Sequence, residues 1–90
     1  MVINGESERI IDVRDHDKYN LFHIEGAENI PFNLLEKCAF EVLDDKYAMI
    51  YIYCDTGLLS AKAAELLNDM GYYNIFDFGR IDKFNAEQDN

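Results

Sequence analysis

The chain has 90 residues and a formal net charge of −10 at pH 7. This length fits one small domain, and the acidic balance argues against a nucleic-acid partner and against an anionic membrane surface. The sequence has no apolar stretch of the roughly 20 residues that a membrane span requires. Its first residues lack the basic and apolar regions of a signal peptide, and its two cysteines do not form a disulfide scaffold. We therefore expect a cytoplasmic protein.

The first third of the chain predicts a strand, a short helix and an extended connection. Residues 10–13 are a short apolar run typical of a buried strand. Asp15 or Asp17 can cap the helix that follows. Residues 25–26 are a glutamate and a glycine, which predict a turn, and residues 29–31 end in the only proline and are expected to be extended.

The rest of the chain alternates helical and strand patterns. Asn33 can cap a helix whose apolar residues fall on one stripe. In residues 48–53 the side chains predicted for both faces of a strand are apolar, as in a central parallel strand covered on both faces. Residues 59–70 have helical spacing, Gly71 fits the position after the helix, and residues 75–78 predict a last strand. This order predicts an α/β fold: a small three-layer domain with a central parallel sheet flanked by helices.

Cys54 is the strongest candidate for a functional residue. It ends the apolar strand and opens a short loop before a predicted helix. Functional sites of parallel α/β sheets lie at the carboxyl ends of the strands. The amino end of a helix offers unpaired N–H groups and partial positive charge, which stabilise a thiolate. We therefore prefer a reactive thiol to an inert buried cysteine.

Four segments in order resemble the rhodanese-like domain family. They are Ile11-Asp12-Val13-Arg14, His23 to Pro31, the loop of Cys54 with Gly57 and Ser60, and the helical residues 61–67 followed by Gly71-Tyr72. The resemblance covers roughly residues 10 to 84. Within the family, the chain is similar to the minimal, single-domain phage-shock type. It implies one domain over residues 1–90, with the family's first strand and helix reduced over residues 1–9 and a short polar tail over residues 85–90.

The resemblance implies sulfur transfer through a persulfide on Cys54. The thiolate would attack the outer sulfur of a donor such as thiosulfate, and an acceptor thiol or cyanide would then remove it. The partners would be a sulfur donor and an acceptor thiol, small or protein-borne, without a cofactor, and no Cys/His cluster has metal-ligand spacing. Backbone N–H groups of the loop could hold the transferred sulfur, and these belong to Asp55, Thr56, Gly57, Leu58, Leu59 and Ser60. Gly57 would supply a positive φ and Ser60 would cap the helix.

The loop departs from the family at two positions. Active thiosulfate sulfurtransferases of this type usually carry a basic residue next to the cysteine and an arginine before the closing serine, where this chain has Asp55 and Leu59. A lost charge-assisted contact costs about 1.5–3 kcal/mol, which disfavours thiosulfate as the donor. Arg14, Lys62 and Arg80 are the cations that could support the site.

Several other residues are predicted to be structural. Cys38 lies on an apolar helix stripe and is expected in the core, and His23 is expected to be structural as in the family motif. His16 is expected to be solvated. Asp12 and Arg14 can form an ion pair that braces the loops at the edge of the sheet.

The sequence also bears on three other classes of function. The loss of loop cations also fits a rhodanese-like interaction or regulatory module without turnover. A phosphatase would need Cys-x5-Arg, but Ser60 stands where that arginine would be. A thiol–disulfide exchanger would need a second cysteine near Cys54. The sequence sets no oligomeric state.

Overall fold

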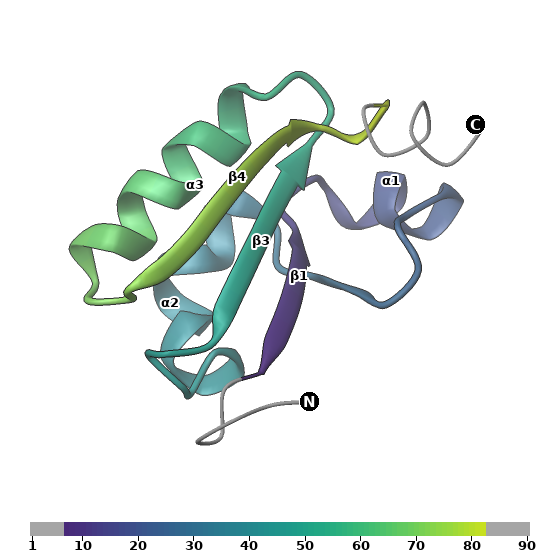
Figure 1. The fold of residues 1–90 in the computed structure, drawn as a ribbon. Coiled ribbons are helices and arrows are strands. Elements are labelled where there is room, and N and C mark those ends of the chain that lie inside the picture. Colours follow the sequence, from purple (N-terminus) through teal and green to yellow (C-terminus); the bar gives the residue numbers. More distant parts are fainter. Residues whose placement is uncertain (1–6, 83–90) are drawn as a thin grey trace.

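The computed structural model describes residues 7–82, which form a parallel sheet and three helices (Figure 1). The strands lie in the order β2-β1-β3-β4, and every neighbouring pair is parallel. The elements in chain order are β1 (Glu8–Asp12), α1 (His16–Leu21), β2 (Ala27–Asn29), α2 (Phe32–Val42), β3 (Met49–Cys54), α3 (Leu58–Asp69) and β4 (Asn74–Arg80). The predicted α/β fold with a central parallel sheet is confirmed.

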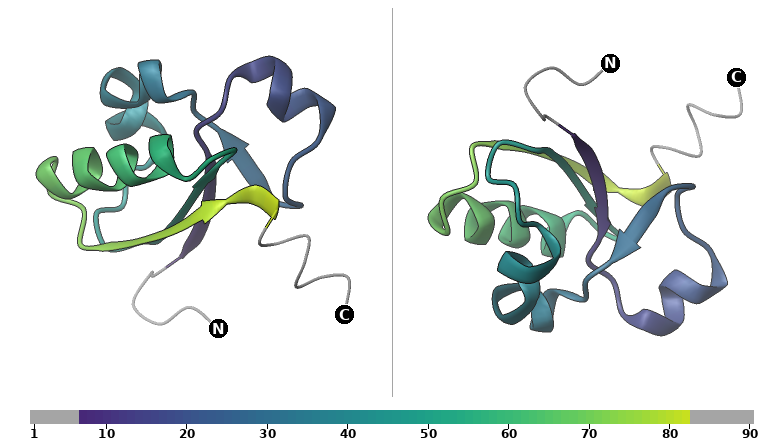
Figure 2. Two further views of the ribbon diagram at one scale, coloured as in Figure 1. Left: turned by 90° about the horizontal axis from the view of Figure 1, so that it is seen from above. Right: turned by 90° about the horizontal axis from the view of Figure 1, so that it is seen from below.

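Helices α2 and α3 pack side by side against one face of the sheet (Figure 2). Every second residue of the two central strands faces them, as the two-residue period of a strand requires. Ile11 of β1 and Ile52 of β3 are register partners, and both are fully buried. Leu35 of α2 and Leu67 of α3 are buried in the same cluster. This packing anchors β3 and α3, the two elements that flank the cysteine loop.

The opposite face of the sheet is covered mainly toward the carboxyl ends of the strands. Tyr53 is fully buried there with Ile24 and Ala27, and Tyr19 of α1 packs against them. Tyr51, two residues earlier on β3, is only partly buried and stacks on two phenylalanine rings of β4. The expectation that residues 48–53 are covered on both faces therefore holds for the end of β3 nearest the cysteine and not for its middle.

The strand boundaries differ slightly from those that the sequence predicted. β1 begins at Glu8, ahead of the apolar run, because Glu8 and Arg9 pair with Met49 and Ile50 of β3. β4 extends to Arg80 through an irregularity in its pairing with β3. Hydrogen bonding to a neighbouring strand extends both elements beyond their apolar residues.

The predicted helix caps were partly wrong. Asp15 occupies the N-cap position of α1, but its side chain makes no capping hydrogen bond. Asn33 is not a cap, because α2 already begins at Phe32 with Pro31 at the N-cap. A proline fits the start of a helix because its missing N–H has no partner there anyway. The expectations for residues 1–6 and 85–90 lie outside the described residues.

Candidate functional site

Cys54 is held at the junction of β3 and α3. It pairs with Arg80 of β4 as the last residue of its strand, and its side chain is 1% exposed. Its Sγ accepts two backbone hydrogen bonds, from the N–H of Gly57 at 3.1 Å and from the N–H of Ser60 at 3.3 Å. Both donors belong to the loop and first turn of α3, where a helix has unpaired N–H groups. The positive end of the helix dipole therefore faces the sulfur.

The loop reaches the sulfur because Gly57 adopts a left-handed backbone. Its φ of 90° is a value that residues with a Cβ rarely adopt. A Cβ placed on Gly57 would lie 3.7 Å from Cγ of Arg80, an ordinary van der Waals contact. The backbone angle, and not a lack of space, therefore requires glycine at this position.

Ser60 does not cap helix α3, contrary to the prediction. Helix α3 begins at Leu58, so Ser60 is its third residue and Gly57 is the N-cap. The buried Ser60 hydroxyl can donate to the carbonyl oxygen of Gly57 at 3.1 Å or to that of Gly79 at 3.4 Å. Ser60 thus ties the start of α3 to the end of β4, while its own N–H points at the cysteine.

A buried ion pair lies beside the loop, as predicted for Asp12 and Arg14. Arg14 Nη2 lies 2.7 Å from Asp12 Oδ2, and these side chains are 7% and 0% exposed. Arg14 also donates to the backbone carbonyl of Phe22, and its Nη1 lies 3.4 Å from Oδ1 of Asp55. The carboxylate of Asp12 raises the pKa of Arg14. Arg14 therefore remains cationic and joins three segments of the carboxyl edge.

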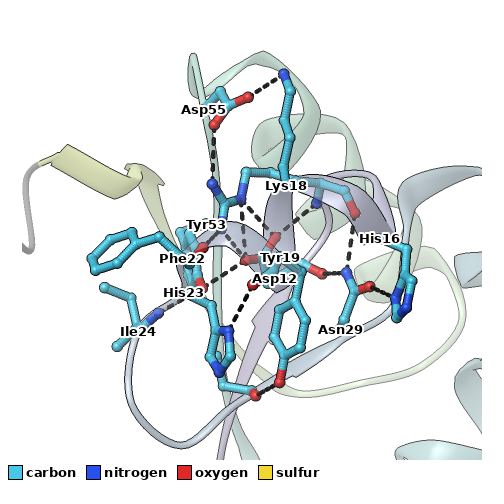
Figure 3. Close-up of polar contacts among 12 residues, drawn as sticks. Asp12, His16, Lys18, Tyr19, Phe22, His23, Ile24, Asn29, Tyr53 and Asp55 are labelled. Carbon is cyan, nitrogen blue, oxygen red and sulfur yellow. Dashed lines mark hydrogen bonds and ion pairs between the residues drawn. The ribbon is translucent and has the colours of Figure 1, made fainter.

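Tyr53 completes this network from β3. Its hydroxyl donates to Oδ2 of Asp12 at 2.7 Å and accepts the N–H of Ile24 at 3.0 Å (Figure 3). Burial is the main cause that raises the pKa of Tyr53, so the phenol stays protonated. The residue next to Cys54 thus fixes the end of β3 against β1.

Lys18 is the residue near the loop that the sequence analysis missed. Its Nζ lies 2.5 Å from Oδ2 of Asp55, and Figure 3 shows the side chain extending from α1 to this carboxylate. The hydrogen bond from Lys18 is the largest cause that lowers the pKa of Asp55, with Arg14 contributing further. A signal was available: β1 and β3 are adjacent parallel strands, so the segments after them meet at one edge.

A cavity of about 140 Å³ opens at Cys54. It is lined by Arg14, Asp15, Lys18, Cys54, Asp55, Thr56 and Leu59. Two cations and two carboxylates thus surround the approach to a thiol that two amides stabilise. This arrangement suits a cysteine nucleophile that attacks a small substrate.

Of the other predicted site residues, Thr56 lines this cavity, whereas Leu58, Lys62 and Arg80 do not. Thr56 accepts the N–H of Leu58 through its Oγ1 at 3.2 Å, and Leu58 itself is 61% exposed. Lys62 is exposed on α3. The guanidinium of Arg80 pairs with Asp82 at 2.5 Å.

The contacts of Cys38 and His23 fit the structural roles predicted for them, and His16 makes a contact that was not predicted. Cys38 is partly buried and packs against the main core cluster. His23 donates from Nδ1 to the carbonyl of Tyr19 at 2.8 Å and stacks on its ring. His16 is exposed as expected but is not without a partner, because its Nδ1 lies 3.1 Å from Oδ1 of Asn29. No cluster that could hold a metal ion occurs within residues 7–82, and no helix there is long and apolar enough to cross a membrane.

Known proteins share this fold and much of this sequence. Residues 2–84 match the rhodanese-like domain family. The thiosulfate sulfurtransferase PspE of Escherichia coli K12 is 34% identical over 75 residues, which cover 83% of this chain and 72% of PspE. A solved structure described as an E. coli rhodanese with anions is 33% identical with a TM-score of 0.80, covering 84% of this chain and 89% of that one. The chain therefore belongs to the rhodanese-like domain family.

Other relatives are longer or more distant. The putative sulfur carrier protein YrkF of Bacillus subtilis is 34% identical over 76 residues, and the match covers 84% of this chain but only 40% of YrkF. The human single-domain sulfurtransferase TSTD1 is 25% identical with a TM-score of 0.68, covering 86% of this chain and 76% of that one. Both names refer to sulfur or its transfer, in accord with the family of the present chain.

Proposed function

We propose that this protein is a sulfurtransferase or sulfur carrier that holds the transferred sulfur as a persulfide on Cys54. The observation that carries the proposal is the pair of N–H groups, from Gly57 and Ser60, that donate to Sγ of Cys54. The thiolate is the nucleophilic form of cysteine, and these N–H groups point at the sulfur that would attack the donor. The cavity at Cys54 is small, which suits a donor that presents a single exposed sulfur.

The first step transfers one sulfur atom to Cys54. The thiolate attacks the outer sulfur of a donor, a new S–S bond forms, and the old bond to that sulfur breaks. The leaving group departs with the electron pair: a thiolate from an alkyl persulfide, or sulfite from thiosulfate. The N–H groups of Gly57 and Ser60 then hold the persulfide, as backbone nests hold other anions.

The second step passes the sulfur on. An acceptor thiolate attacks the outer sulfur of the Cys54 persulfide and takes it, and the Cys54 thiolate leaves and is restored. No electrons are gained or lost overall, so neither a cofactor nor a metal is needed. A reducing cytoplasm would keep Cys54 free for the next cycle.

Mass spectrometry tests the proposal. The purified protein is incubated with an alkyl persulfide or with thiosulfate, and its intact mass is measured before and after treatment with a reducing thiol. We expect a gain of one sulfur atom that is lost on reduction, and that is absent in Cys54→Ser and retained in Cys38→Ser. Failure of both donors to add sulfur to Cys54 contradicts the proposal.

A second candidate is a rhodanese-like interaction or regulatory module without turnover. It is favoured by Asp55, a carboxylate next to the cysteine that pairs with both cations lining the cavity. This function predicts that a strain carrying Cys54→Ser keeps the wild-type phenotype while a deletion does not. Loss of the phenotype with that one substitution would exclude the module.

A further inference from the structure

The side chain of Asp55 contacts both cations that line the cavity at Cys54. Lys18 contacts its Oδ2 at 2.5 Å and Arg14 contacts its Oδ1 at 3.4 Å. Figure 3 shows Lys18 directed at this carboxylate from α1. All three residues line the cavity that leads to Cys54. The cations at the entrance to the thiol are therefore already paired with an anion that belongs to the protein.

We propose that Asp55 determines donor specificity: it occupies the cations of the cavity and directs the site away from dianionic donors such as thiosulfate and toward persulfides that carry no anionic group beyond the sulfur transferred. This inference rests on the proposed function and adds the class of donor to it.

The direction of the reaction explains why these cations matter. In displacement at sulfur, the leaving group points away from the attacking atom. Sγ of Cys54 is held from the loop side by Gly57 and Ser60, so the leaving group of a bound donor faces the cavity. With thiosulfate that group is a sulfonate with negative charge, and Lys18 and Arg14 are the cations that line its path. With an alkyl persulfide it is a short thioalkyl group that is uncharged in the bound donor and takes up a single negative charge only as it leaves as a thiolate.

Asp55 competes with a dianionic donor in two ways. An internal carboxylate has a high effective concentration at Lys18, so a dissolved anion must displace it. Its pKa is lowered by Lys18 and Arg14, so it remains charged at neutral pH. Asp15 also lines the cavity and adds a second negative charge. A donor that displaced Asp55 from Lys18 would still be repelled by both carboxylates.

The first half-reaction isolates this effect from the choice of acceptor. Thiosulfate and the Cys54 thiolate give the Cys54 persulfide and sulfite, so sulfite release in a single turnover yields a second-order rate constant. The comparison donor is 2-hydroxyethyl persulfide, whose outer sulfur passes to Cys54 while 2-hydroxyethanethiolate leaves. Both reactions are followed by intact mass as well.

Four variants form the experiment. Asp55→Asn removes the charge and keeps the shape, and Lys18→Gln removes the opposite charge. The double variant closes a double-mutant cycle. Asp69→Asn is the matched control, because it makes the same charge change at the exposed far end of α3, roughly 16 Å from the start of the helix. Urea midpoints verify that each variant is folded.

We expect Asp55→Asn to load from thiosulfate about fivefold faster than the wild type, with less than a twofold change for the alkyl persulfide. Lys18→Gln alone should slow loading from thiosulfate, because it removes a cation from the cavity and leaves the charge of Asp55 without its partner. In the Lys18→Gln background, the gain in thiosulfate loading caused by Asp55→Asn should be less than half of the gain in the wild-type background. The gain should also shrink in high salt, since it is electrostatic.

Different outcomes overturn different statements. Equal thiosulfate rates in Asp55→Asn and Asp69→Asn, with the alkyl persulfide still loading Cys54, overturn the role of Asp55 and leave the proposed function standing. A gain that persists in full in the double variant shows that it does not act through Lys18 and overturns the inference as well. If neither donor loads sulfur onto the wild type or any variant, the proposed function and the inference about Asp55 both fail.

Discussion

The hydroxyl of Tyr53 lies 2.7 Å from Oδ2 of Asp12, and this contact joins the strand that carries Cys54 to its neighbour β1. Asp12 in turn holds Arg14 through several hydrogen bonds, and Arg14 contacts Asp55 in the loop. The position of the loop therefore depends on a buried network on β1 and β3 as well as on the backbone of the loop.

Removing the Tyr53 hydroxyl is expected to destabilise the fold. In Tyr53→Phe the buried N–H of Ile24 loses its acceptor and Asp12 loses a donor. A buried group left without a partner costs about 1–3 kcal/mol, so the urea midpoint should fall without a change in m-value. Tyr47→Phe is the control, because Tyr47 is 61% exposed. Equal midpoints for the two variants would contradict this role of Tyr53.

Breaking the Asp12–Arg14 pair is expected to cost more. Asp12→Asn keeps the shape but leaves the guanidinium of Arg14, which is 7% exposed, without its main counter-charge. Removing one partner of a buried pair costs about 3–5 kcal/mol. Chemical denaturation measures the loss, and Glu28→Gln is the control because its pair with Arg9 is more exposed. A loss no larger than that of the control would show that the buried pair adds little.

The same network shows how far sequence patterns reach. The Asp12–Arg14 pair was predictable because two residues of one segment form it, and the position of Cys54 followed from a strand, a loop and a helix in direct succession. The pairing of Lys18 with Asp55 joins residues 37 apart. The strand order brings α1 and the cysteine loop to the same edge of the sheet. Which side chains meet there depends on how α1 is placed over that edge, which neither periodicity nor a motif specifies.

The caps failed for a related physical reason. Several polar residues near a helix start can act as a cap, and the backbone decides between them. At α3 the left-handed Gly57 sets the start, so Ser60 falls inside the helix. At α2, Pro31 sets the start of the helix, so Asn33 also falls inside the helix. The parallel sheet was predictable because the order of apolar runs and helical patterns determines it.

The left-handed angle of Gly57 predicts a cost for any residue with a Cβ. Gly57→Ala should lower the free energy of unfolding by about 1–2 kcal/mol. Gly57→Asn should cost less, because asparagine tolerates left-handed angles better than alanine does. Denaturation in urea measures both. If alanine proved no worse than asparagine, the strain would not come from the backbone angle.

The ion pair of Asp55 predicts a pH dependence with a definite sign. Lys18 and Arg14 lower the pKa of Asp55 below its ordinary 3.8 in the folded chain, so unfolding in acid takes up a proton. The stability that the pair adds is present above that ordinary pKa and is lost as pH falls through the folded pKa. The difference in unfolding free energy between wild type and Asp55→Asn should therefore shrink between pH 6 and pH 3 (about one unit below the ordinary value). A difference that stays constant would mean that no such pair exists in solution.

Restoring an arginine before Ser60 is expected to improve the use of thiosulfate. Leu59 lines the cavity, so Leu59→Arg would place a guanidinium beside the leaving group of the donor. A charge-assisted contact of this kind corresponds to about tenfold faster loading. The gain should be larger in an Asp55→Asn background, because Asp55 would otherwise pair with the new arginine. Leu59→Gln is the control for size and polarity, and single-turnover sulfite release measures all three variants. If glutamine served as well as arginine, charge at this position would not limit the reaction.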